Sequence, residues 1–127
     1  MKISKLFVIG VFLFLGNCQQ IKENHLVGKW RAVEVLEEGK KLTVDVTKIH
    51  IEFQPSHYEY YSTLNHKEAG TYYLQSNLLV TKDTLKKEAV EKAVEVTHLS
   101  EDSLFIRMNE KGQERILKMA KEWRIEN

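Results

Sequence analysis

Apolar residues along most of the chain recur with a period of two, or in short runs separated by turn residues. The clearest example begins at Ile49, where Ile49, Ile51 and Phe53 alternate with His50 and Glu52. Alternation of this kind places one set of side chains on the buried face of a strand and the other set in solvent. His50 and Glu52 are therefore expected on the outer, solvated face of the sheet.

Segments of this kind follow one another at short, even spacing, with turn residues between them. The expected strands lie at 26–36, 49–53, 57–63, 70–75, 78–82, 94–99, 104–109 and 114–121, with a weaker piece at 42–46. Short strands at such spacing are typical of an all-β sandwich or barrel. Tight turns join antiparallel neighbours, and the pattern shows no long crossover helix of the kind that parallel sheets require. The sequence thus predicts an antiparallel meander.

The segment at 85–96 fits two interpretations. It is rich in Lys, Glu and Ala, and its apolar positions recur at helical spacing. The sheet context favours a strand that starts at about Val90. A short helix near 85–93, followed by a strand, is the alternative.

The N-terminal residues are typical of a bacterial secretory signal. Lys2 and Lys5 precede an apolar stretch at 6–16 that carries no charged or hydrogen-bonding side chain. A charged start followed by a short apolar stretch is the pattern of an export signal. The stretch is shorter than the roughly 20 residues that a transmembrane helix needs.

The end of this signal, Leu15-Gly16-Asn17-Cys18, resembles the lipobox of bacterial lipoproteins, although Asn17 is larger than the usual residue before the cysteine. The resemblance implies that the Cys18 sulfur is lipidated, that residues 1–17 are removed and that the new amino terminus is acylated. An ordinary secretory signal, cleaved or retained, with a free thiol is the alternative.

A lipidated Cys18 would make the protein a lipid-anchored component of the cell envelope. Residues 18–25 are then a short polar tether, and residues 26–127 are the folded domain. Residue 19 is Gln, and the sorting rule of such lipoproteins assigns a chain without Asp at this position to the outer membrane.

Three segments of the mature chain resemble the lipocalin-like domains of small bacterial lipoproteins. These are Leu26-Val27-Gly28-Lys29-Trp30, Gly70-Thr71-Tyr72 and Leu99-Ser100-Glu101-Asp102-Ser103-Leu104. The resemblance implies a small up-and-down barrel of about eight antiparallel strands. It also implies that Trp30 packs across one end of the barrel. Eight strands enclose room for side chains or for one small ligand.

Composition and motifs argue against several classes of function. The 19 Lys and Arg residues are balanced by 18 Asp and Glu residues, so a net charge of +1 provides no basic field for nucleic acid. The single cysteine excludes a disulfide framework. The chain carries neither a nucleophile elbow nor a phosphate-binding loop, and its five histidines lack the spacing of a metal site. We therefore expect a protein that is not an enzyme and that uses no cofactor or metal.

Aromatic residues are the candidates for ligand contact. On the alternation of the strands and the family resemblance, these are Trp30, Phe53, Tyr58, Tyr60 and Tyr72. An aromatic pocket with hydroxyl groups at its edge suits a small hydrophobic or amphipathic ligand. The alternative is a filled barrel that acts through its outer face on an envelope protein or enzyme, for example as an inhibitor or assembly factor.

Overall fold

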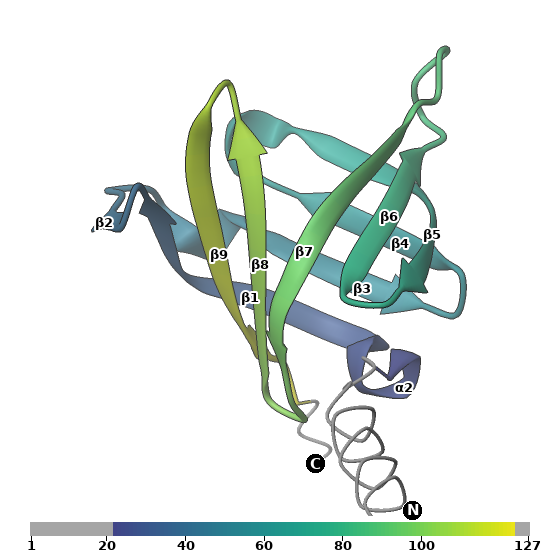
Figure 1. Ribbon diagram of the computed structural model, residues 1–127, viewed down its shortest axis with the longest axis horizontal. Helices are drawn as coiled ribbons and strands as arrows, with labels where there is room; N and C mark the ends of the chain where they lie inside the picture. Colours follow the sequence, from purple (N-terminus) through teal and green to yellow (C-terminus); the bar gives the residue numbers. More distant parts are fainter. Residues whose placement is uncertain (1–21, 124–127) are drawn as a thin grey trace, which may run out of the picture.

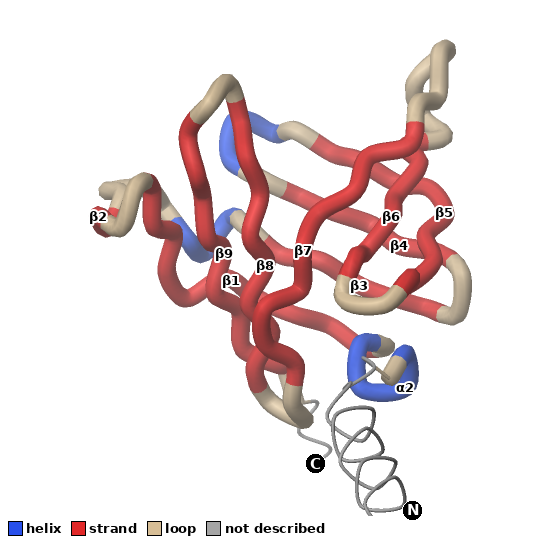
Figure 2. The backbone as a smooth tube through the Cα atoms, viewed as in Figure 1, coloured by secondary structure: helices blue, strands red, loops and turns tan. Residues whose placement is uncertain are grey.

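The computed structural model describes residues 22–123, which fold into one closed antiparallel sheet (Figures 1 and 2). The strands in this part of the chain are β1 (Gly28–Glu37), β2 (Lys40–Lys41), β3 (His50–Gln54), β4 (His57–Tyr61), β5 (Lys67–Gln75), β6 (Leu78–Asp83), β7 (Glu91–Leu99), β8 (Ser103–Glu110) and β9 (Gln113–Lys121). Three helical turns accompany them: α2 (Glu23–Leu26), η1 (Val46–Lys48) and η2 (Thr63–Asn65). The order is β2-β1-β3-β4-β5-β6-β7-β8-β9, and β1 also pairs with β9. The predicted up-and-down barrel of eight strands is confirmed, with β2 as a short extension.

The first strand, β1, closes the barrel because it pairs with both β3 and β9. Its register against β9 shifts between Ala32 and Glu34, which marks Val33 as the extra residue of a β-bulge. A bulge bends a strand and increases its twist, as closure of a barrel requires. Val33 points outward and is 44% exposed. A second bulge, at Thr97, bends β7 in the same way.

The segment between β6 and β7 is not helical. Residues 84–90 form turns and bends, so the short helix considered near 85–93 is absent, and β7 begins one residue after the expected start at Val90. The first five residues of β7 lie opposite β6 in the sheet. Helix propensity amounts to less than about 1 kcal/mol per residue, and the hydrogen bonds to β6 outweigh it.

The weaker piece expected at 42–46 is not a strand either. After β2 the chain runs without regular structure to Asp45, which caps η1. The Asp45 carboxylate accepts hydrogen bonds from the backbone N–H of Thr47 at 3.2 Å and from its hydroxyl at 2.5 Å. Leu42 and Val44 therefore lie in a loop at one end of the barrel.

Alternate residues of the barrel strands point inward and form a single core. Its buried members are Leu26, Trp30, Ala32, Ile49, Ile51, Phe53, Tyr58, Tyr72, Leu79, Val96, Leu104, Ile106, Leu117 and Met119. The predicted alternation around Ile49 is confirmed. His50 is exposed on the outer face, where its ring stacks on Tyr61 with centroids 4.6 Å apart, and Glu52 is half-buried on the same face.

Trp30 closes one end of the barrel, as the family resemblance implied. Its side chain is fully buried, and its indole N–H donates a 2.8 Å hydrogen bond to the carbonyl of Leu26 in α2. The Lys121 ammonium lies 4.8 Å from the Trp30 ring centroid and donates hydrogen bonds to the carbonyls of Val27, at 2.7 Å, and His25, at 3.2 Å. These contacts join α2, β1 and the end of β9, which meet at the lower end of the barrel in Figure 1.

The expected signal peptide, residues 1–17, and Cys18 lie outside the described residues. Part of the range 18–25, expected to be a polar tether, is ordered: α2 starts at Glu23 and seats the fully buried Leu26 against the barrel. The folded structure thus includes residues on the N-terminal side of position 26.

Candidate functional site

The inward-facing side chains fill the barrel unevenly along its axis. At the closed end, Leu26, Trp30, Leu104 and Met119 are almost fully buried. Towards the other end, a cavity of about 210 Å³ remains between the strands. Its apolar wall consists of Ile51, Phe53, Leu79, Val94, Ile106, Met108 and Leu117. The interior is therefore a plug of side chains at one end and a hollow at the other.

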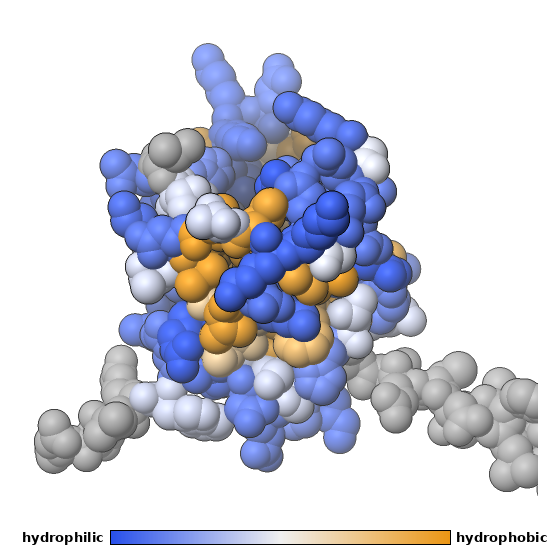
Figure 3. All heavy atoms as spheres, turned by 90° about the vertical axis from the view of Figure 1, so that its left-hand side faces the viewer, coloured by the Kyte–Doolittle hydropathy of each residue, from blue (hydrophilic) through white to orange (hydrophobic). Residues whose placement is uncertain are grey.

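The cavity adjoins a wider recess of about 310 Å³ at the mouth of the barrel. The two share Tyr60, Glu68, Lys92, Met108, Glu110 and Leu117 as lining residues. Leu42 and Val44 line the mouth from the loop after β2, and His66 lines it from the turn before β5. Figure 3 views the side of the molecule that carries β2 and shows apolar surface at the centre of this side, surrounded and crossed by hydrophilic groups.

The structure brings together three of the five predicted ligand-contact residues. Phe53, Tyr58 and Tyr60 line the cavity. Trp30 does not, because it is enclosed at the opposite end of the barrel. Tyr72 also lies in the core without lining the cavity, and its ring packs edge-on against Phe53 with centroids 5.1 Å apart. Trp30 and Tyr72 therefore belong to the packed part of the interior.

A buried carboxylate faces the same cavity. Glu68 of β5 is 8% exposed, and its Oε2 accepts a 2.5 Å hydrogen bond from the Tyr58 hydroxyl. Burial, followed by this hydrogen bond and the charge of Glu68, raises the pKa of Tyr58 well above its usual value. Tyr58 is thus held as the neutral phenol that donates to Glu68. Sequence analysis missed Glu68 because it treated positions 65–68 as a turn, although alternation back from Tyr72 through Gly70 leads to an inward-facing position.

Charged side chains surround the mouth. Arg115 lies between two carboxylates, with nitrogen–oxygen distances of 3.7 Å to Glu37 and 3.6 Å to Glu110. Lys92 lines the mouth from the start of β7 with an exposed side chain. Sequence analysis named neither Lys92 nor Arg115 as a candidate. Their alternation with Val94 in β7 and with Leu117 in β9 would have placed Lys92 and Arg115 on the inner face.

No protein-family model matches the sequence, and no curated protein matches it. The structure is similar to the crystal structure of a lipocalin-like protein from Bacteroides uniformis ATCC 8492, with a TM-score of 0.58 and 19% sequence identity. The likeness covers 77% of this chain and 99% of that chain.

The fold is lipocalin-like. At this level of identity the likeness establishes the fold alone, so the chemistry of the interior has to be read from this chain's own residues. The lipocalin-like barrel encloses a cavity with an apolar wall, one buried carboxylate and a charged rim.

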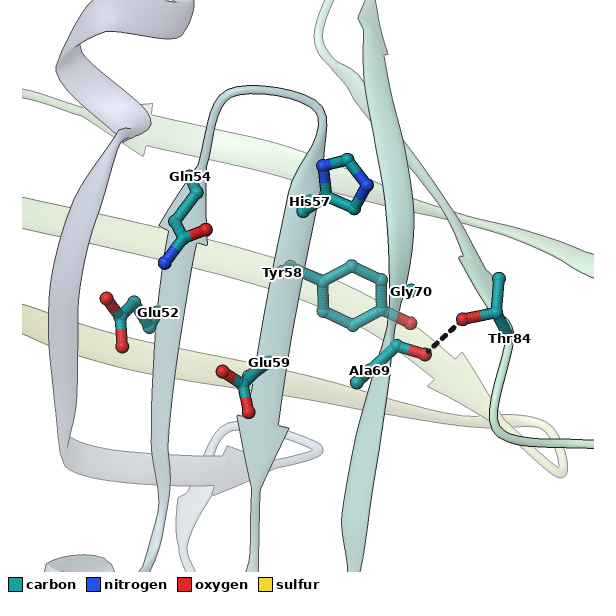
Figure 4. A pocket seen from close by; sticks show the side chains of 8 residues that line it. All are labelled: Glu52, Gln54, His57, Tyr58, Glu59, Ala69, Gly70 and Thr84. Atoms are coloured by element: carbon teal, nitrogen blue, oxygen red, sulfur yellow. Dashed lines mark hydrogen bonds between the residues drawn. The ribbon is translucent and has the colours of Figure 1, made fainter.

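The outer face of the lipocalin-like barrel carries a separate groove of about 280 Å³ across β3, β4 and β5 (Figure 4). Glu52 and Glu59 lie directly opposite each other along it. Tyr58 lines both this groove and the inner cavity, so its ring separates the two. Only glycine fits at position 70, opposite Tyr58 in the sheet, because a Cβ there would lie 1.8 Å from the carbonyl oxygen of Lys82.

Two further features of the described residues bear on function. Between positions 22 and 123, no group of three His, Cys, Asp or Glu side chains is arranged to hold a metal ion. No helix in this part of the chain is long and apolar enough to cross a membrane.

Tyr58 and Tyr72, the two buried tyrosines among residues 22–123, predict opposite effects of losing a hydroxyl. The Tyr72 hydroxyl is buried and has no hydrogen-bond partner among the described residues, so Tyr72→Phe should stabilise the fold by about 1 kcal/mol. Tyr58→Phe removes the donor to the buried Glu68 carboxylate and should destabilise the fold by about 1–3 kcal/mol. Urea unfolding at pH 7 measures both, and a loss of stability in Tyr72→Phe would contradict the assignment.

Tyr72 also predicts how the free energy of unfolding depends on pH. Burial raises the pKa of Tyr72 to about 12, whereas an unfolded tyrosine titrates near pH 10. The unfolded chain loses the proton first. The titration of Tyr72 therefore leaves the free energy of unfolding unchanged below about pH 10 and lowers it as the pH rises towards 12. Tyr72→Phe should therefore flatten the decline in stability over this interval, and an unchanged profile would contradict the account.

Proposed function

We propose that this protein is a membrane-anchored envelope lipoprotein whose lipocalin-like barrel binds one small hydrophobic or amphipathic ligand and catalyses no reaction. The observation that supports binding is the inner cavity, which combines an apolar wall with polar groups at the mouth. This combination is typical of small-molecule sites, in which apolar contacts contribute affinity and a few polar groups fix orientation.

The dimensions favour a small ligand. A cavity of about 210 Å³ that opens into a recess of about 310 Å³ is near the lower limit of the roughly 300–1,000 Å³ usual for ligand sites. A short chain or a single ring system fits this space. The hollow also argues against the alternative of a filled barrel that acts only through its outer face.

The topology supports a mouth that points away from the membrane. The first described residues and the end of β9 lie at the closed end, while the mouth is at the other end of the barrel. Lys22 is four positions after Cys18 in the sequence, a span of at most about 14 Å. A lipid on Cys18 would thus hold the closed end near the membrane surface and leave the mouth open to the aqueous phase.

Filling the cavity should abolish binding. Native mass spectrometry of the protein purified from its own envelope is expected to show a bound small molecule in addition to the chain mass. Val94→Trp places a large side chain in the cavity wall and should remove most of that bound mass. Val33→Trp makes the same change on the outer face, at the bulge of β1, and should retain it. Wild-type protein that is uniformly empty would contradict the proposal.

The anchor is tested separately at the single cysteine. Cys18→Ser removes the sulfur that accepts the lipid, so the chain should lose its partition into detergent and the mass of the acyl groups. Fractionation of the envelope followed by intact-mass measurement shows both effects. A variant that keeps the mature mass and the detergent partition of the wild type would refute lipidation at Cys18.

A further inference from the structure

We propose that the ligand is an organic cation, an amine with a small apolar body, and that its ammonium group pairs with Glu68 inside the barrel. This inference rests on the proposed function, since it names the class of molecule that the cavity holds. It depends on three observations. A buried carboxylate has no cation beside it, aromatic rings line the same cavity, and the arginine at the mouth already pairs with other carboxylates.

Glu68 is the most buried charged group in the cavity wall, at 8% exposure. Among residues 22–123, no Lys, Arg or His nitrogen lies within 4 Å of its carboxylate. A buried carboxylate without a cation is costly, and the Tyr58 hydroxyl, the one hydrogen-bond donor found for it, brings no charge. A ligand ammonium would supply both the opposite charge and further N–H donors.

The surroundings of Glu68 suit a cation with an apolar body. Phe53, Tyr58 and Tyr60 line the same cavity. The faces of aromatic rings attract ammonium groups. Leu79 and Leu117 continue the wall with apolar surface. The Tyr58 hydrogen bond occupies Oε2 and leaves Oε1 as the acceptor for a ligand N–H.

The cations at the mouth are poorly placed to hold an anion instead. Arg115 is already within 4 Å of the carboxylates of Glu37 and Glu110. Lys92 is exposed to solvent, where an ion pair contributes little. An anionic amphipath would therefore rely on Lys92 and would have to bring its negative charge into a cavity that contains Glu68.

The experiment compares three ligands that differ only in their head group. Octylamine, octanoate and octanol are titrated by calorimetry into the full chain reconstituted in phosphatidylcholine nanodiscs, with chain-free nanodiscs as the control for partition. We expect octylamine to bind at least about tenfold more tightly than the other two, because its head group alone brings a positive charge to the Glu68 carboxylate.

Variants then locate the head group. Glu68→Gln preserves the shape of the side chain and an acceptor for Tyr58, and it should cost octylamine about tenfold in affinity with no loss for octanol. Glu101→Gln removes the same charge from the turn between β7 and β8 and should leave all three affinities unchanged. Thermal unfolding followed by circular dichroism establishes that Glu68→Gln is folded, and if it is not, the three wild-type affinities decide the question.

The outcomes separate the two proposals. If none of the three molecules binds, the proposed function fails together with this inference. If octanoate or octanol binds as well as octylamine, or if Glu68→Gln keeps the preference for octylamine, the barrel is a ligand-binding protein and the amine assignment is overturned. An octanoate preference that disappears in Lys92→Gln would identify the anionic alternative.

Discussion

The antiparallel pairing of β1 with β9 converts a series of hairpins into a closed barrel, and the interior of the molecule depends on it. Once the ring is closed, no long sheet edge remains for other chains to join. Closure also fixes which side chains face inward, because adjacent residues of a strand point to opposite faces. The bulge at Val33 bends β1 so that one strand can serve two neighbours, β3 and β9.

Within that ring, one aromatic residue anchors the packed end of the interior, opposite the hollow end. Trp30 is fully buried, and its indole N–H donates a hydrogen bond to the Leu26 carbonyl in α2. The Lys121 ammonium lies over its ring. Replacing a large buried aromatic residue by alanine generally costs about 3–5 kcal/mol, so this end contributes strongly to stability. The side chains beyond it leave a cavity, and charged groups surround its mouth. One end of the barrel thus stabilises the fold, and the other end holds the cavity proposed to bind a ligand.

Period-two alternation was sufficient to predict an antiparallel meander and the inward-facing Phe53, Tyr58 and Tyr60, because it reflects the geometry of each strand separately. The resemblance to lipocalin-like domains added the expectation that the meander forms an eight-stranded barrel. The alternation failed at position 68, which fell in the turn expected between the strands at 57–63 and 70–75. Glu68 points inward although it is charged, and only its hydrogen bond to Tyr58 of the neighbouring strand shows that burial is tolerated. The Arg115–Glu37 pair joins the two strands that close the barrel, and single-strand patterns contain no information about such cross-strand contacts. In the first part of β7, pairing with β6 outweighs local helix propensity, as the sheet context indicated in favouring a strand from about Val90.

The central claim is that the lipocalin-like barrel is packed at the Trp30 end and hollow at the other. Xenon enters apolar cavities in proteins, so methyl NMR spectra recorded under xenon pressure test this claim most directly. The account predicts shifts for the methyl groups of Leu79 and Leu117, which line the cavity, and unchanged signals for Leu26 and Leu104 at the packed end. Equal shifts at both ends, or no shifts for Leu79 and Leu117, would contradict it.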